Sequence, residues 1–119
     1  MKSYSKEIIY ARMLEYLAEN LGNYHRITVR DVHTALKISR VYLHMICKSN
    51  KGVSARRVIN AAIIQKAIEF YYLDSIELKL IADKLGFSDV VSFYHFFKRI
   101  AGCNLMNYMD QHENIINAK

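Results

Sequence analysis

Residues 81–102 decide the fold, and they read IADKLGFSDVVSFYHFFKRIAG. Ile81 and Leu85 lie about one helical turn apart, and Gly86 is placed to end that short helix. We expect Ser88 to cap a second helix, whose inward face follows the spacing i, i+3, i+4 and i+7 with Phe93, Phe96, Phe97 and Ile100. A short helix, a tight turn and a capped second helix together form a helix-turn-helix.

An earlier part of the chain repeats this pattern. Forty-nine positions before Ile81, Leu85, Phe87 and Ser88 stand Val32, Leu36, Ile38 and Ser39. Past the turn the offset is fifty, so that Phe93, Phe97, Lys98 and Gly102 correspond to Leu43, Cys47, Lys48 and Gly52. The second helix of such a unit normally enters the major groove of DNA. An ordinary all-helical core with accidental self-similarity is the alternative interpretation.

Apolar residues at helical spacing continue through the rest of the chain, and strand-like alternation is scarce. The first helix is expected from about Ser5 to Leu21, with Gly22 as its cap and an inward stripe of Tyr10, Met13, Leu14, Leu17 and Leu21. Caps for the next three helices are expected at Thr28, Ser39 and Ser54.

The second half is expected to hold three more helices. Asp74-Ser75 should break the chain and cap a short helix that is lined by Ile76, Leu80, Ile81 and Leu85. Asn104 should open a last helix that buries Leu105, Tyr108 and Met109. The predicted fold is therefore all-α, with seven helices and two helix-turn-helix subdomains joined by a long linker helix. The lobes are expected at about 5–53 and 74–112, and the linker segment at 54–73.

We call the second helix of each helix-turn-helix unit its reading helix. The linker helix has a length that suits two reading helices on one duplex. About 19 residues, from Ala55 to Leu73, would span roughly 28 Å. Successive major-groove faces on one side of DNA lie about 34 Å apart. We expect one molecule to cover two turns of duplex, with a small DNA bend that takes up the difference.

Composition agrees with a nucleic-acid partner and gives no support to other classes of protein. Lys and Arg outnumber Asp and Glu by 17 to 11, which leaves a net charge of +6 and favours a polyanion. We find no signal peptide and no run of roughly 18 apolar residues. Cys47 and Cys103 form no CxxC pair, which indicates a reducing, cytoplasmic location. We expect no metal, no cofactor and no catalysis, because neither a ligand spacing nor a phosphate-binding loop is present.

The sequence resembles the AraC/XylS family of bacterial transcription regulators. Its second unit, 81–89 followed by 92–99 and Gly102, is similar to the family signature IA..LGFSD…F…FK…G, and the first unit, from Ser39 to Ser54, is similar to S..YL…FK…G.S. The resemblance implies a two-lobed DNA-binding fold, with RNA polymerase and a separate sensor or dimerisation domain as candidate partners. The sequence departs from the pattern at His33, Lys37, Cys47, Ile63 and Leu105.

Two sets of side chains are expected on the DNA-facing sides of the reading helices. The first helix should present Arg40, Val41, His44, Met45 and Lys48. The second should present Val91, Ser92, His95, Lys98 and Arg99. Arg40 and His44 are suited to guanine, and Val41 and Met45 to thymine methyl groups. The resemblance implies that Val91, Ser92 and His95 are reading positions of the second helix. Lys48, Lys98 and Arg99 are suited to phosphate.

Backbone N–H groups that open helices are a further expected phosphate contact. They lie at Ser54-Ala55 and at Ser88-Asp89, although the Asp89 carboxylate is expected to repel phosphate or to fill the helix end itself.

A helix-turn-helix that docks a partner protein is the alternative function. It is motivated by apolar residues at reading positions, namely Val41, Met45, Val90 and Val91. DNA binding should weaken steeply with salt, whereas apolar docking should barely respond.

Overall fold

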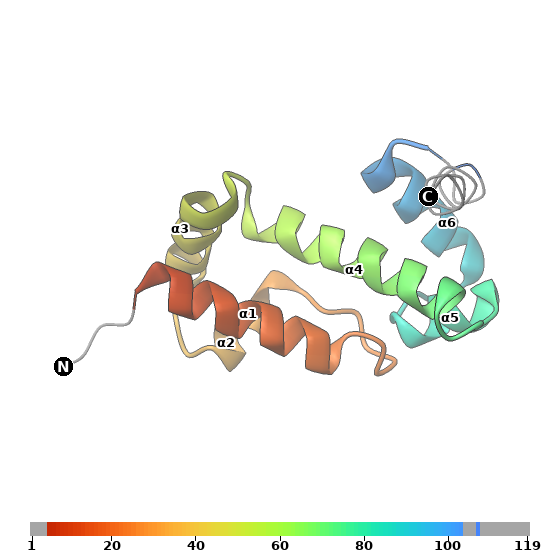
Figure 1. Cartoon of the computed structure of the whole chain (residues 1–119), viewed down its shortest axis with the longest axis horizontal. Helices are drawn as coiled ribbons and strands as arrows, with labels where there is room; N and C mark the ends of the chain where they lie inside the picture. The colour runs from red at the N-terminus through yellow and green to blue at the C-terminus, as the bar shows by residue number, and fades with distance from the viewer. Residues whose placement is uncertain (1–4, 104–106, 108–119) are drawn as a thin grey trace.

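The computed structural model describes residues 5–103 and 107, and it is all-α over that part of the chain. Six helices lie there, against the seven expected: α1 (Lys6–Asn20), α2 (Val29–Ala35), α3 (Arg40–Lys51), α4 (Ala55–Tyr72), α5 (Leu78–Lys84) and α6 (Val90–Ala101). The last expected helix, with Asn104, Leu105, Tyr108 and Met109, falls outside the described residues. Helices α1, α2 and α3 form one lobe, α5 and α6 belong to a second, and α4 joins them (Figure 1).

Side-chain caps start the helices of the first lobe where the sequence places them. The Ser5 and Ser39 hydroxyls accept hydrogen bonds from the N–H groups of Ile8 and Tyr42. Thr28 and Asp31 form a reciprocal capping box at the start of α2. At the other end of α1 the cap is Leu21 rather than the expected Gly22, because Leu21 is already extended, with ψ at 133°, and its N–H donates to Leu17.

The internal repeat is reproduced in the hydrogen bonds of the two turns. The Ile38 N–H donates to the His33 carbonyl at 3.1 Å, and forty-nine residues later the Phe87 N–H donates to the Ala82 carbonyl at 3.0 Å. Lys37 has a φ of +58°, close to the +86° of its counterpart Gly86. Because two distant segments adopt the same left-handed turn with the same bonds, accidental similarity of an ordinary core does not account for the repeat.

Helix α4 begins as expected, since the Ser54 hydroxyl accepts a hydrogen bond from the Arg57 N–H at 3.3 Å. The chain leaves the helical conformation after α4 at Asp74-Ser75, as the sequence predicts, but these two residues do not cap α5. Ser75 takes a left-handed φ of +53°, and the N-cap is Glu77, which makes no side-chain cap hydrogen bond. The expected Ser88 cap of α6 is wrong by one residue, because Asp89 caps that helix.

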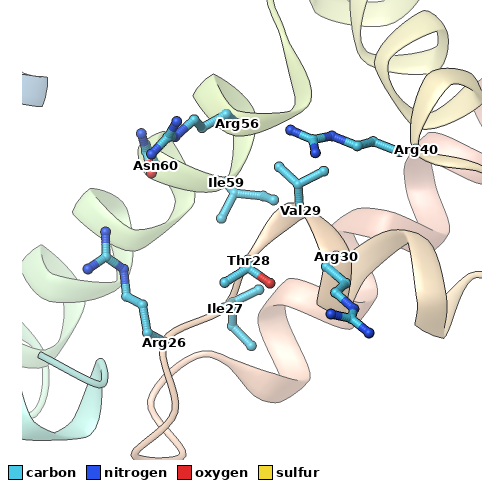
Figure 2. A pocket seen from close by; sticks show the side chains of 9 residues that line it. All are labelled: Arg26, Ile27, Thr28, Val29, Arg30, Arg40, Arg56, Ile59 and Asn60. Carbon is cyan, nitrogen blue, oxygen red and sulfur yellow. The ribbon is translucent and has the colours of Figure 1, made fainter.

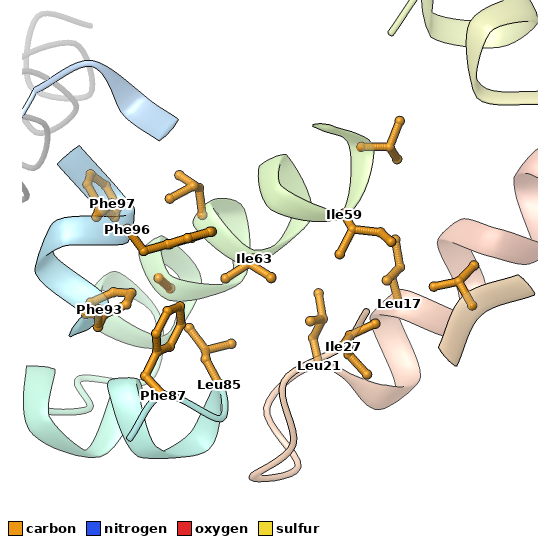
Figure 3. Close-up of a cluster of buried hydrophobic side chains, with 14 of the residues drawn as sticks. Leu17, Leu21, Ile27, Ile59, Ile63, Leu85, Phe87, Phe93, Phe96 and Phe97 are labelled. Carbon is orange, nitrogen blue, oxygen red and sulfur yellow. The ribbon is translucent and has the colours of Figure 1, made fainter. Parts of the chain in front are cut away.

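One apolar core runs through both lobes. Figure 3 shows Ile59 of α4 beside Leu17 of the first lobe, and Ile63 of α4 between Leu21 and the aromatic cluster of the second lobe. The three phenylalanines of α6 are buried, as is Cys47, whose thiol donates to the Met13 sulfur at 3.6 Å. Three residues that were expected to point inward are instead exposed, namely Leu14, Leu80 and Ile100.

Among the described residues, every helix is too short or too polar to cross a lipid bilayer.

Candidate nucleic-acid interface

Helix α3 separates an inward face from an outward one. Leu43, Ile46 and Cys47 are buried against the lobe. On the opposite side Val41 and Met45 are 69% and 49% exposed, and the side chains of Arg40 and Lys48 are also open to solvent. Four of the five residues predicted to face DNA from this helix are therefore accessible.

His44, the fifth predicted residue, has a structural contact as well. Its ring is half-buried, and its Nδ1 accepts a hydrogen bond from the Ala55 N–H at 3.3 Å. An accepting nitrogen carries no proton, so only Nε2 of the neutral ring is left to donate to a base. The same bond occupies the Ala55 N–H, which corrects its expected role as a phosphate donor at the start of α4.

Helix α6 presents the predicted second set together. Val91, Ser92, His95, Lys98 and Arg99 are exposed, while Phe93, Phe96 and Phe97 are buried behind them. The Arg99 guanidinium lies 5.8 Å from the centre of the Phe96 ring, so part of this exposed side chain packs along the core.

A carboxylate stands at the beginning of α6. The Asp89 Oδ1 accepts a hydrogen bond from the Ser92 N–H at 2.7 Å. The hydrogen bonds from Ser92, helped by the nearby His95, lower the pKa of Asp89. Asp89 therefore fills this helix end with a negative charge, as expected from sequence, and the first turn of α6 is a poor place for a phosphate.

Arg26 is a further residue of the candidate interface, and its place there is not predicted from the sequence. It lies in the loop between α1 and α2, yet its guanidinium stacks on two rings of the second lobe, 4.2 Å from the Phe87 centroid and 4.7 Å from the Phe96 centroid. Burial, with smaller contributions from the charges of Arg99 and Arg56, lowers the pKa of Arg26. No local pattern predicts this contact, because it joins positions that are sixty or more residues apart in the chain.

The loop that carries Arg26 also makes backbone contacts with the second lobe. The Tyr24 N–H donates to the Lys84 carbonyl at 2.8 Å. Gly86 approaches the same loop so closely that an added Cβ would lie 2.2 Å from the backbone nitrogen of Arg26. The two lobes are thus connected twice, by α4 and by this loop contact.

Two hollows meet at Arg26. One, of about 320 Å³, is lined by residues from the Arg26 loop, α2, α3 and α4 and includes four arginines: Arg26, Arg30, Arg40 and Arg56. Figure 2 shows the Arg26, Arg40 and Arg56 side chains around Ile27, Val29 and Ile59. The other, of about 380 Å³, is lined by Arg26, Phe87, Ser92, His95, Phe96 and Arg99. Arg26 lines both hollows, one of which includes Arg40 of α3 and the other Ser92, His95 and Arg99 of α6, and we call the two hollows together the inter-lobe groove.

A comparison with protein-family models identifies the fold. The model described as "Helix-turn-helix domain" matches residues 32–111, well over half of the chain. The chain belongs to the AraC-type helix-turn-helix family. The family is one of DNA-binding transcription regulators, so this AraC-type chain is a DNA-binding domain and not an enzyme.

Solved structures share the AraC-type architecture. The C-terminal domain of AraT, a response regulator from Geobacillus stearothermophilus, superposes with a TM-score of 0.70 at 23% identity, over 87% of this chain and 84% of that one. The C-terminal domain of the response regulator yesN from Fusobacterium nucleatum gives 0.68 at 21% identity, over 84% and 96%. The DNA-binding domain of AdpA, a global transcriptional factor solved with a target DNA, gives 0.65 at 17% identity, over 94% and 96%. At these identities the likeness concerns the fold.

A comparison with curated protein sequences finds no match.

Proposed function

We propose that this domain regulates transcription by binding a specific double-stranded DNA sequence through two helix-turn-helix units in adjacent major grooves. One observation carries the proposal: the same turn occurs before α3 and before α6, these two helices lie at opposite ends of α4 (Figure 1), and each has an exposed face. A single unit would read one groove, whereas two connected units suit a longer site.

The dimensions support this geometry. Helix α4 has 18 residues, which corresponds to about 27 Å of axis, compared with about 34 Å for one turn of DNA. The difference between the helix length and one turn of DNA is small enough to be taken up by a modest bend of the duplex, which costs a few kcal/mol. In this proposal the lobes comprise residues 5–53 and 74–112, with 54–73 between them.

The proposed contacts divide by chemistry. Arg40, His44 through Nε2, Ser92 and His95 donate to base edges, and Val41, Met45 and Val91 contact thymine methyl groups. Lys48, Lys98 and Arg99 bind phosphates and set the register without reading sequence. RNA polymerase and a sensor or dimerisation domain are proposed as further partners, and the bacterial cytoplasm as the location.

A selection from a pool of randomised duplexes at moderate salt tests the proposal. We expect a two-part motif whose halves are about one helical turn apart, with protection of both halves in a footprint. Recovery of a single half-site, or of no motif, contradicts the two-groove model.

Exposed apolar reading positions favour one alternative, a helix-turn-helix that docks a protein. Val41 and Val91 are 69% and 55% exposed, whereas Val90 is half-buried and drops out of this set. A salt titration distinguishes the two functions. The DNA affinity should fall by orders of magnitude between 50 and 200 mM salt for about 6 to 10 phosphate contacts, whereas an apolar protein complex should keep its affinity.

A further inference from the structure

Arginines occupy the first turns of three helices, where a positive charge is unfavourable for the helix. Arg30 is the second residue of α2, Arg40 the first of α3 and Arg56 the second of α4. The helix dipole places partial positive charge at each of these ends, so acidic residues are the stabilising choice there. Neither α3 nor α4 has an acidic residue in its first turn. Helix stability therefore does not account for these arginines.

In the part of the chain that the structure describes, these arginines are not paired with an acidic side chain. No ion pair within residues 5–103 involves Arg26, Arg30, Arg40 or Arg56. Among the described residues that line the two halves of the inter-lobe groove, none is an Asp or a Glu. Arg26 is half-buried beside the charges of Arg56 and Arg99, which repel it. A groove that gathers like charges in this way is complementary to an anion.

We propose that the inter-lobe groove binds the phosphate backbone of the DNA segment that lies between the two major-groove contacts. Arg56 and Arg26 are the central phosphate ligands, and Arg26 in addition holds the two lobes together through Phe87 and Phe96. The proposal rests on the function proposed above and adds to it a phosphate contact by Arg26 and Arg56, between the base-reading residues at the two ends of the groove.

Continuity with the reading helices favours DNA over a small anion. At one end the groove includes Arg40 of α3, and at the other it includes Ser92, His95 and Arg99 of α6. A duplex that engages both helices must pass its backbone across the space between them. A guanidinium suits this position because its planar donors fit phosphate oxygens.

Arg56→Gln is the variant of choice, because Arg56 is exposed and its charge opposes the helix dipole, so folding should be kept. The control is Arg12→Gln, which removes the same charge from an exposed position on α1 that lines neither part of the groove. On the selected duplex we expect Arg56→Gln to weaken binding about tenfold and to lower the salt slope by about 0.9, with Arg12→Gln close to wild type.

Neutral methylphosphonate groups in the same duplex locate the contact. Placed between the two halves of the motif, they should weaken wild-type binding about tenfold and have little further effect on Arg56→Gln. Placed outside the motif, they should matter little to either protein. Equal penalties for both proteins, or no penalty at the central phosphates, overturn the proposal. If a two-part motif is selected and neutralising the central phosphates does not change the affinity, this inference fails while the proposed function stands. If no motif is recovered, both fail.

Discussion

Val41 and Val91 occupy equivalent positions in the two reading helices, fifty residues apart, and both are largely exposed. Lys48 and Lys98 form a second equivalent pair, also exposed. An exposed valine offers no hydrogen bond to a base edge, and the thymine methyl is the apolar group that the major groove presents to it. A lysine near the end of the same helix is suited to phosphate. The proposed function therefore assigns to each unit a base-reading end and a phosphate-binding end.

That division can be measured with Lys98→Ala and His95→Ala. We expect Lys98→Ala to weaken binding to all duplexes alike and to lower the salt slope by about 0.9. His95→Ala should instead relax the preference at one or two base positions, by roughly 1–3 kcal/mol. Affinities for the selected duplex and its single-base variants, measured over a salt series, give both quantities. A uniform loss for His95→Ala would mean that this ring touches the backbone.

Phe97 tests the buried side of the same helix, since its side chain is fully buried. We expect Phe97→Ala to lower the free energy of unfolding by about 3–5 kcal/mol, through lost burial and the cavity that is left. Chemical denaturation measures the change. Val91→Ala, on the exposed side of α6, is the matched control and should change stability by less than about 0.5 kcal/mol. A small effect at Phe97 would contradict its burial.

At the scale of the helices, start signals in the sequence are informative where one polar residue stands alone. Ser39 and Ser54 are correctly predicted as caps because no competing cap residue adjoins them on the helix side. Ser88 and Asp89 are both good caps, and local sequence cannot choose between adjacent candidates. Glu77 carries no signal, since α5 starts without a side-chain cap. Its start follows from an extended connection after the left-handed Ser75.

The capping box of α2 gives the fold an acid-sensitive bond. Burial alone would raise the pKa of Asp31, but hydrogen bonds from the Thr28 N–H and hydroxyl and from His25 lower it. A lowered pKa stabilises the fold above the ordinary Asp range, near 3.9, and this contribution is lost as the pH falls through the folded value. We expect Asp31→Ala to cost about 1 kcal/mol at pH 7.

Unfolding curves of wild type and Asp31→Ala at a series of pH values provide the measurement. The difference between the two proteins should shrink as the pH falls below about 4. Thr28→Ser, which keeps the hydroxyl cap, should remain close to wild type. A difference that is constant down to pH 2 would mean that the carboxylate makes no charged contact in the folded state.

At the scale of the whole molecule, two connections hold the lobes. The repeat and the long linker helix can be predicted from sequence, because both depend on helical periodicity and on glycines at fixed spacing. The contact of the Arg26 loop with Gly86, Phe87 and Phe96 cannot be predicted from local sequence, because it is a tertiary contact between the lobes. The inter-lobe groove, which depends on that contact, is missed for the same reason.

Gly86→Ala tests the loop contact directly. The φ of Gly86, +86°, disfavours any side chain, and the new Cβ would lie 2.2 Å from the backbone nitrogen of Arg26. Gly52 is a matched control, since its φ of +73° imposes a similar backbone strain while no atom lies within 4 Å of its Cβ position. We expect Gly52→Ala to cost about 1 kcal/mol in thermal unfolding and Gly86→Ala to cost clearly more. Equal losses would mean that the lobes do not touch at Gly86.

A closed loop of chain, made of α4 on one side and the Arg26 contact on the other, resists stretching and twisting in a way that a single helix cannot. One extra base pair between the half-sites displaces the second by about 3.4 Å and rotates it by about 35°. Because its lobes are connected at two points, the molecule cannot adjust to both this displacement and this rotation of the second half-site. We therefore expect a duplex with one inserted base pair to bind as weakly as a single half-site, and Gly86→Ala protein to tolerate the insertion better. Band-shift titrations with the spaced duplexes would show the difference.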